Sequence, residues 1–333
     1  MRTNDQYRVQ VGKVARLYYE HGLTHAEIAE LQGLSRVKVT RLLADARRLG
    51  IVEIRVHSDD RPFAELEAAL VQRFNLLGAW VAPRFGPDTE RSMSSLGLVG
   101  AACLTALVPA ARRVAVGLSS AVAASVAQLR DPPTTDVEVL PVAGSPAGRS
   151  FTANPGEIAL GLAQAFGGTA YYLPAPLLAS SSRVAQSMRK DEGVRSMLDK
   201  AAESDLLVVG IGSITRVSDA LVKSMTPAEL TALRRGDVVG DISARFFNAT
   251  GNPVTSEVDD RVIGLDLPTL RSIPTRVGIV GGPDKHRALR TALAAGLINV
   301  LVTDSASASM ALAPYARDRP DVSADPAPST IRA

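Results

Sequence analysis

Short apolar runs alternate with helix-like segments between residues 63 and 313, and this alternation is the strongest constraint on the fold. It is typical of an α/β domain in which crossover helices connect the strands of a parallel sheet. The expected strands are residues 78–82, 113–116, 137–142, 170–173, 206–211, 276–280 and 300–303. The expected helices include residues 64–74, 95–108, 158–166 and 288–295.

Glycine-rich loops follow several of these strands. In a parallel sheet, ligands bind at the carboxyl ends of the strands, where loops and helix N-termini offer backbone amides. Four loops contain Gly117, Ser119 and Ser120; Gly144 and Ser145; Gly210 and Gly212; and Gly281 and Lys285. One such loop is weak evidence because tight turns need glycine, but four favour a small ligand that carries phosphate or many hydroxyls. The chain has no GxGxxG or GxxxxGK[ST] motif, so we expect no dinucleotide, ATP or other cofactor.

Residues 11–49 have a helical pattern. A first helix is expected around residues 11–20. Thr24 and Glu27 form a capping box, in which each side chain bonds the other residue's backbone amide and starts a second helix. Gly33 suits a left-handed turn, and Ser35 caps a third helix over residues 36–49.

The third helix has an apolar stripe on one side and a basic, hydroxyl-bearing side opposite. Two capped helices joined by a glycine turn are the helix-turn-helix arrangement, whose second helix enters the DNA major groove. The alternative, a solvated basic face on a helical hairpin, is disfavoured because Ala29, Gly33 and Val39 suit a tight helix crossing. The expected DNA-contacting residues are Ser35, Arg36, Val37, Lys38, Thr40, Arg41, Arg47 and Arg48. Arginine can donate to guanine or phosphate, and Val37 can contact a thymine methyl.

The charge distribution supports a separate DNA-binding head. Residues 1–57 contain ten Lys or Arg and six Asp or Glu, which gives them a net charge of +4. Because the whole chain has a net charge of +3, the remaining residues total −1. A basic head on a nearly neutral body indicates that only the head binds a polyanion.

The compartment follows from the cysteine content and the apolar runs. Cys103 is the single cysteine, so no internal disulfide can form, which favours a reducing cytoplasm. The N-terminus has no apolar core and does not resemble a signal peptide. Residues 96–111 are almost wholly apolar but fall short of the ~20 residues that span a bilayer, so we expect a buried helix and no membrane partner.

These patterns divide the chain into four parts. Residues 1–57 are the expected DNA-binding domain, 58–62 a linker, 63–313 the ligand-binding domain and 314–333 a disordered tail. Residues 51–56 alternate apolar and polar, which predicts a short strand. This strand would be either a wing beside the helices or the exit into the linker.

Four segments resemble the SorC family of transcriptional regulators. The head resembles the family in YYEHGLTHAEIAELQGLSRVKVTRLLADARRLGIVEI, and the body resembles it in GDVVGDISARFFNATGNPV and RVIGLDLPTLRSIP. The most specific segment is VGIVGGPDKHRALRTALAAGLINVLVTDSASA, at residues 277–308. The resemblance runs over most of the chain, and the helix-turn-helix alone would not identify the family.

The resemblance implies a Rossmann-like effector domain similar to sugar-phosphate isomerases and deaminases, used for sensing rather than turnover. It implies a phosphorylated sugar as effector and a tetramer, often built from dimers. The implied ligand-binding residues are Gly117, Ser119, Ser120, Gly144, Ser145, Gly210, Gly212, Asp241, Phe246, Gly281, Lys285 and Asp304. The chain departs from the family after the first loop, where Ala121, Val122 and Ala123 replace a glycine and a hydroxyl residue and remove a donor.

Each of these residues also has a purely structural interpretation. Lys285 is either a phosphate ligand or an exposed first-turn residue, and its glycine loop favours binding. Asp241 either accepts sugar hydroxyls or caps the turn before Ser243, and the choice stays open. For Asp304, a role as the N-cap of the last helix is favoured over ligand binding. Phe246 belongs either to the core or to a lid.

Four arginines, Arg183, Arg189, Arg216 and Arg245, are candidates for phosphate pairing by charge alone, and we expect each to be a surface residue instead. The histidines show no metal spacing, so no metal site is expected. The sequence thus predicts a cytoplasmic, homo-oligomeric (dimeric or tetrameric) regulator that binds double-stranded operator DNA and answers to a sugar or sugar phosphate. The alternative is an isomerase-like enzyme with an accessory DNA-binding head, but no paired-carboxylate or histidine motif stands out for proton transfer.

Overall fold

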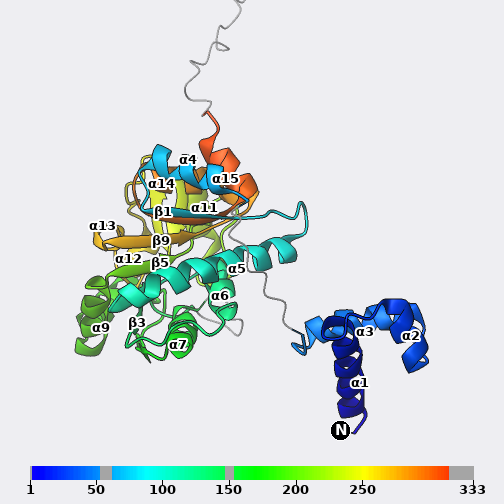
Figure 1. Ribbon diagram of the computed structural model, residues 1–333. Coiled ribbons are helices and arrows are strands. Elements are labelled where there is room, and N and C mark those ends of the chain that lie inside the picture. Colours follow the sequence, from blue (N-terminus) through cyan, green and yellow to red (C-terminus); the bar gives the residue numbers. More distant parts are fainter. Residues whose placement is uncertain (1, 53–61, 147–153, 315–333) are drawn as a thin grey trace, which may run out of the picture. The chain divides into compact units, whose positions relative to one another are not determined.

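The computed structural model describes residues 2–52, 62–146 and 154–314. The chain forms two compact units, Met1–Pro62 and Phe63–Ala333, and each is described by itself (Figure 1). Several expectations lie outside the described residues: residues 53–56 of the strand expected over 51–56, the linker before Pro62, residues 147–153 after the second glycine loop, and the tail beyond Pro314. Ile51 and Val52, the first two residues of that expected strand, are described and lie in no strand.

Three helices form the first unit: α1 (Arg2–Tyr19), α2 (His25–Gln32) and α3 (Arg36–Arg48). The expected capping box is confirmed, because the Thr24 hydroxyl accepts the Glu27 amide and the Glu27 carboxylate accepts the Thr24 amide. Gly33 ends α2 in the left-handed conformation, with a φ of 61°. The helices enclose a small apolar core of Val11, Val14, Ala15, Ile28, Ala29, Val39, Leu42, Leu43 and Ala46.

A seven-stranded sheet forms the centre of the second unit, and its strand order is β1-β10-β9-β5-β2-β3-β4. The strands are β1 (Gly78–Ala82), β2 (Arg113–Val116), β3 (Glu138–Pro141), β4 (Thr169–Ala170), β5 (Leu206–Val209), β9 (Thr275–Ile279) and β10 (Val300–Asp304). All neighbouring strands are parallel, which confirms the predicted sheet. β1 and β2 match the expected residues, whereas β4 is only two residues long.

Helices cover both faces of this sheet, with α4 and α15 on one side and α5, α6 and α7 on the other (Figure 1). The main helices are α4 (Ala64–Phe74), α5 (Thr89–Leu107), α6 (Ser120–Ala127), α7 (Pro155–Phe166), α9 (Glu192–Ala202), α14 (His286–Ala294) and α15 (Ser305–Leu312). β2 shows the alternation that results: Val114 and Val116 pack with α5, α6 and α7, while Ala115 packs with the helices of the opposite face.

Most of the apolar run at residues 96–111 lies in α5, which Asp88 caps, and the run ends in a short 3-10 helix, Val108–Ala110. By length and composition this helix could cross a membrane. Its inner side, however, includes Leu96, Cys103 and Leu104, which are fully or almost fully buried against the sheet. The expectation of a buried helix therefore agrees with the structure, and α5 begins earlier than the apolar pattern predicted.

A three-stranded antiparallel sheet was not expected from the sequence. It consists of β6 (Gly212–Ser213), β7 (Val238–Ile242) and β8 (Arg245–Asn248), in that order. Only Ser243 and Ala244 join β7 to β8, and both have positive φ angles. Further helices not expected from the sequence are α8 (Ser182–Lys190), α10 (Asp219–Val222), α11 (Pro227–Arg235), α12 (Glu257–Arg261) and α13 (Leu267–Ser272).

An ionic cluster joins α9 to the amino ends of β2 and β3. Glu138 Oε1 accepts from Lys200 Nζ at 2.5 Å and from the Tyr171 hydroxyl at 2.7 Å, while Glu138 Oε2 accepts from Arg113 Nε at 2.7 Å. These donors, that of Lys200 first, lower the pKa of Glu138 from 4.5 to about 2. The cluster lies at the amino ends of the strands, and the glycine loops lie at their carboxyl ends. It therefore stabilises the unit away from the candidate ligand site.

Candidate DNA-binding and effector sites

The outer face of α3 carries all eight residues predicted to contact DNA, and all are exposed. Ser35 caps the helix, since its hydroxyl accepts the Lys38 amide at 3.2 Å. Val37 is 81% exposed although it is apolar. An exposed valine between cations is unfavourable in water alone and suits contact with a base edge.

Besides Ser35, two of these residues have side-chain partners within the head. The Thr40 hydroxyl donates to the Arg36 carbonyl at 3.1 Å and lies 3.3 Å from His25 Nδ1. Arg48 Nη2 pairs with Asp45 Oδ1 at 2.7 Å. By contrast, the side chains of Arg36, Lys38, Arg41 and Arg47 have no ion pair with any other described residue. Their charge is therefore available to phosphate.

Sequence reasoning missed a contact that fixes α3 against α1. The Tyr7 hydroxyl donates to Asp45 Oδ2, and the other carboxylate oxygen of Asp45, Oδ1, accepts from Arg48. The hydrogen bond raises the pKa of Tyr7 and lowers the pKa of Asp45. Tyr7 and Asp45 lie 38 positions apart, so no local pattern could have revealed the pair.

The carboxyl ends of the strands bring most of the predicted ligand-binding residues together. A Cβ on Gly210 would lie 2.3 Å from Ser119 Oγ, and one on Gly212 would lie 1.8 Å from Asp241 Oδ1. These distances leave no room for a side chain, so the first and third loops and β7 are in direct contact. Gly144 instead packs against the Pro176 carbonyl, and Ser145 Oγ lies 3.2 Å from Asn154 Oδ1, so the second loop packs against a different segment.

Asp241 and Lys285 are the charged pair of this site. Asp241 is buried, and its Oδ2 accepts the Ala244 amide at 3.1 Å. Burial raises the pKa of Asp241, an effect that the Ala244 amide and the Lys285 charge oppose. Burial lowers the pKa of the partly buried Lys285, while Asp241 raises it. The Lys285 side chain has no hydrogen bond or ion pair with another described residue, so its ammonium is free to bind an anion.

Asp304 uses both carboxylate oxygens within the protein. Oδ1 accepts the Ser307 amide at 2.8 Å, and Oδ2 accepts from Arg84, from the Gly282 amide and from the Ser307 hydroxyl. Asp304 is thus the N-cap of α15, the role favoured from the sequence. Through Gly282, which has a φ of 104°, it also fixes the loop that ends at Lys285.

Other predicted residues belong to the core. Phe246 is 2% exposed and packs in the cluster between the two sheets, so it is a core residue and no lid. Ala121 and Val122, which depart from the family pattern, are also buried, in the cluster beneath α6. Their side chains therefore fill the core, and the departure leaves the loop residues Gly117, Ser119 and Ser120 in place.

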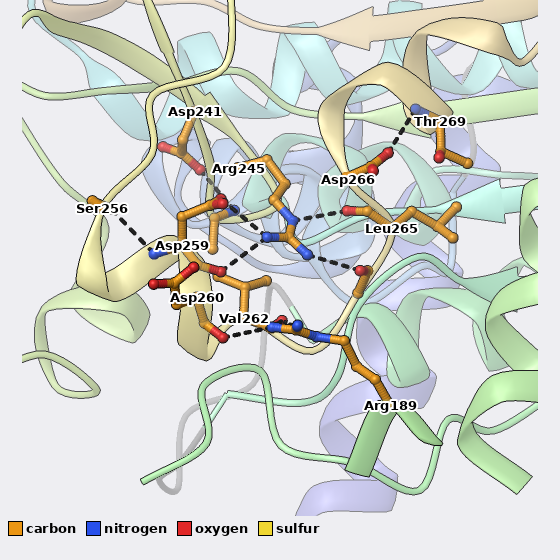
Figure 2. Close-up of polar contacts among 12 residues, drawn as sticks. Arg189, Asp241, Arg245, Ser256, Asp259, Asp260, Val262, Leu265, Asp266 and Thr269 are labelled. Atoms are coloured by element: carbon orange, nitrogen blue, oxygen red, sulfur yellow. Dashed lines mark hydrogen bonds and ion pairs between the residues drawn. The ribbon is translucent and has the colours of Figure 1, made fainter. Parts of the chain in front are cut away.

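The expectation that all four candidate arginines lie on the surface is wrong for Arg245, which is 7% exposed. Figure 2 shows Arg245 and Arg189 directed at the same stretch of backbone. Arg245 donates to the carbonyls of Leu265, Gly264 and Asp259 at 2.9–3.0 Å and pairs with the Asp259 carboxylate. Arg189 donates to the carbonyls of Asp260 and Val262. Both side chains are structural, because they hold backbone carbonyls in place. The charge of an arginine in the sequence could not reveal these carbonyl partners.

The family comparisons agree with this architecture. A profile of the family described as "Putative sugar-binding domain" matches residues 61–313. The transcriptional regulator LsrR of Klebsiella pneumoniae is 33% identical over 310 residues, which cover 91% of this chain and 92% of LsrR. LsrR of Escherichia coli K12 is 31% identical over 308 residues, which cover 91% and 94% of the two chains.

Solved structures superpose on this chain as well. The full-length sorbitol operon regulator SorC from Klebsiella pneumoniae superposes with a TM-score of 0.72 at 27% identity, covering 91% of this chain and 98% of SorC. A DeoR family transcriptional regulator from Listeria monocytogenes superposes with a TM-score of 0.69 at 26% identity, covering 75% of this chain and 99% of its own. The chain therefore belongs to the SorC family of sugar-binding transcriptional regulators.

Proposed function

We propose that this protein is a cytoplasmic transcriptional regulator whose affinity for operator DNA changes when a sugar or phosphorylated sugar binds the α/β unit. Residues 1–57 are the DNA-binding domain and residues 63–313 the effector domain. The protein acts as a homo-oligomer, a dimer or tetramer, because paired heads read half-sites separated by multiples of about one helical turn. It carries out no reaction on its ligand.

The free cation Lys285 beside the buried Asp241 is the observation that carries this proposal. A cation without a hydrogen-bond or ion-pair partner among the described residues suits a phosphate or another anionic group, and a neighbouring carboxylate oxygen suits sugar hydroxyls. Asp241 Oδ2 accepts the Ala244 amide, and the carboxylate has further lone pairs with which to accept from a ligand. Ligand binding then changes the DNA affinity of the head only if the ligand binds two arrangements of the subunits with different affinities.

Operator binding tests the DNA-binding half. DNA fragments are first selected with the wild-type protein, and affinities are measured at one fixed salt concentration. Arg36→Ala combined with Arg41→Ala should weaken specific binding by at least ~10-fold, because each base or phosphate contact contributes ~1–3 kcal/mol. The matched control, Arg234→Ala with Arg235→Ala, removes the same charge from exposed positions of α11 and should bind normally. Unchanged affinity of the first variant would exclude this face as the reading surface.

A thermal-shift screen of sugars and their phosphates tests the effector half. Ligands that stabilise the wild type should lose that effect in Lys285→Ala and keep it in Lys223→Ala, an exposed lysine that follows α10. Equal stabilisation of the Lys285→Ala variant would remove the assigned role of Lys285. Each hit is then incubated with the wild type, and chemical conversion of the sugar would favour the isomerase-like alternative over a sensor.

A further inference from the structure

The turn between β7 and β8 has an unfavourable backbone. Ser243 has a φ of 51° and Ala244 a φ of 68°, and both residues are almost fully buried. Positive φ at both central residues is the mark of a type I′ hairpin turn, in which Asn-Gly is preferred. A Cβ atom makes the left-handed conformation unfavourable, so surrounding contacts must hold these two residues in place.

Two hydrogen bonds provide those contacts. Asp241 Oδ2 accepts the Ala244 amide at 3.1 Å, which ties the turn to the candidate effector carboxylate. Ser243 Oγ accepts the Leu118 amide at 3.1 Å, which ties the turn to the first glycine loop 125 positions away. The serine hydroxyl also occupies the space beside Gly117, where a Cβ would lie 2.3 Å from Ser243 Oγ.

The first loop is held from its other side as well. Gly210 approaches Ser119 so closely that a Cβ would lie 2.3 Å from its hydroxyl oxygen. That oxygen accepts the Val122 amide at 3.2 Å and so caps α6. The loop therefore lies between the third loop and the β7–β8 turn. The hydrogen bond from Leu118 to Ser243 connects it to this turn, whose next residue, Ala244, donates to Asp241.

We propose that Ser243 is a positioning residue of the effector site: its hydroxyl holds Gly117–Ser119 in the orientation that receives the ligand. The inference rests on the proposed function, which places the effector among these loops. Ser243 would also transmit ligand contact at Asp241 to the start of α6, because both hydrogen bonds meet in the same two-residue turn. Ala244 has the same backbone conformation but no hydroxyl. A substitution at Ala244 therefore tests the turn conformation alone, whereas a substitution at Ser243 also tests the hydroxyl.

Hydrogen exchange of the unliganded full-length protein provides the first test. Ser243→Gly relieves the unfavourable φ but removes the acceptor, so the Leu118 amide should exchange ~10-fold faster or more. Ala244→Gly relieves the neighbouring φ and keeps the acceptor, so the same amide should exchange within about two-fold of the wild-type rate. An unchanged Leu118 exchange rate in Ser243→Gly would overturn the proposal.

Ligand titration provides the second test, with inorganic phosphate, a pentose monophosphate and a hexose monophosphate as probes. Ser243→Gly should weaken the probe that the wild type binds best by ~10-fold, with no decrease in its urea midpoint. Ala244→Gly should bind normally, and an equal loss of affinity in both variants would overturn the proposal. If the wild type bound none of the probes while Leu118 exchange still rose in Ser243→Gly, the effector site would fail but the hold on the loop would stand.

Discussion

The Arg245→Met substitution removes a buried guanidinium that joins β8 to residues 259–265. Methionine keeps the length of the side chain but leaves the carbonyls of Gly264 and Leu265 without donors. An unsatisfied buried acceptor costs ~1–3 kcal/mol, so the two together cost ~2–6 kcal/mol. The wild type in turn bears the desolvation of a buried cation, which offsets part of this difference. We expect a net loss of ~3 kcal/mol in the free energy of unfolding.

Urea unfolding followed by tryptophan fluorescence measures this loss in the correct unit. The chain has one tryptophan, Trp80, and it lies in β1, so the signal reports the α/β unit and not the head. Arg216→Met is the matched control, because Arg216 pairs with Asp284 at 3.6 Å and both side chains are at least half exposed. An exposed pair of this kind contributes less than ~0.5 kcal/mol. If Arg245→Met destabilises the unit no more than Arg216→Met, the structural role of Arg245 is refuted.

Three further predictions concern other parts of the molecule. The pKa of Glu138 is about 2 against an ordinary 4.5, so its carboxylate stabilises the fold above pH 4.5 and loses that effect as the pH falls toward 2. The Glu138→Gln variant should therefore have a lower urea midpoint than the wild type at neutral pH, and this difference should shrink between pH 4.5 and pH 2. Gly212→Ala places a methyl 1.8 Å from Asp241 Oδ1 and should lower the free energy of unfolding by ~1–3 kcal/mol; an unchanged urea midpoint would contradict this. Tyr7→Phe loses the hydrogen bond to Asp45 and should weaken operator binding several-fold at fixed salt, while tryptophan-monitored urea unfolding stays as in the wild type.

The parallel sheet was predictable from the sequence because most of its strands contain short apolar runs that alternate with helical segments. Leu206–Val209, for example, is buried at every position, which is the property that a continuous apolar run reports. The antiparallel sheet was not predictable by the same means. β7 contains a glycine and an aspartate, and its turn is Ser-Ala rather than the Asn-Gly or Asp-Gly that signals a hairpin.

The candidate site shows the same division between local and long-range information. The role of Asp304 as a helix N-cap depends on Ser307, three residues away, and was visible in the sequence. The environment of Arg245 depends on carbonyls 14 to 20 positions away, whose orientation only the folded chain sets. Glycine positions were correctly grouped as loops, but the contacts that require glycine there, such as Ser243 with Gly117, join residues that no periodicity relates.

The strand order has a consequence for the synthesis of this protein. β1, at residues 78–82, is an edge strand whose neighbour is β10, at residues 300–304. During translation, β1 and the apolar helix α5 leave the ribosome about two hundred residues before the strand that pairs with β1. The nascent chain therefore carries an uncovered strand edge and an apolar helix for most of its elongation. A chain that terminates before β10 leaves β1 unpaired and should aggregate, whereas loss of the residues beyond α15 leaves the sheet complete.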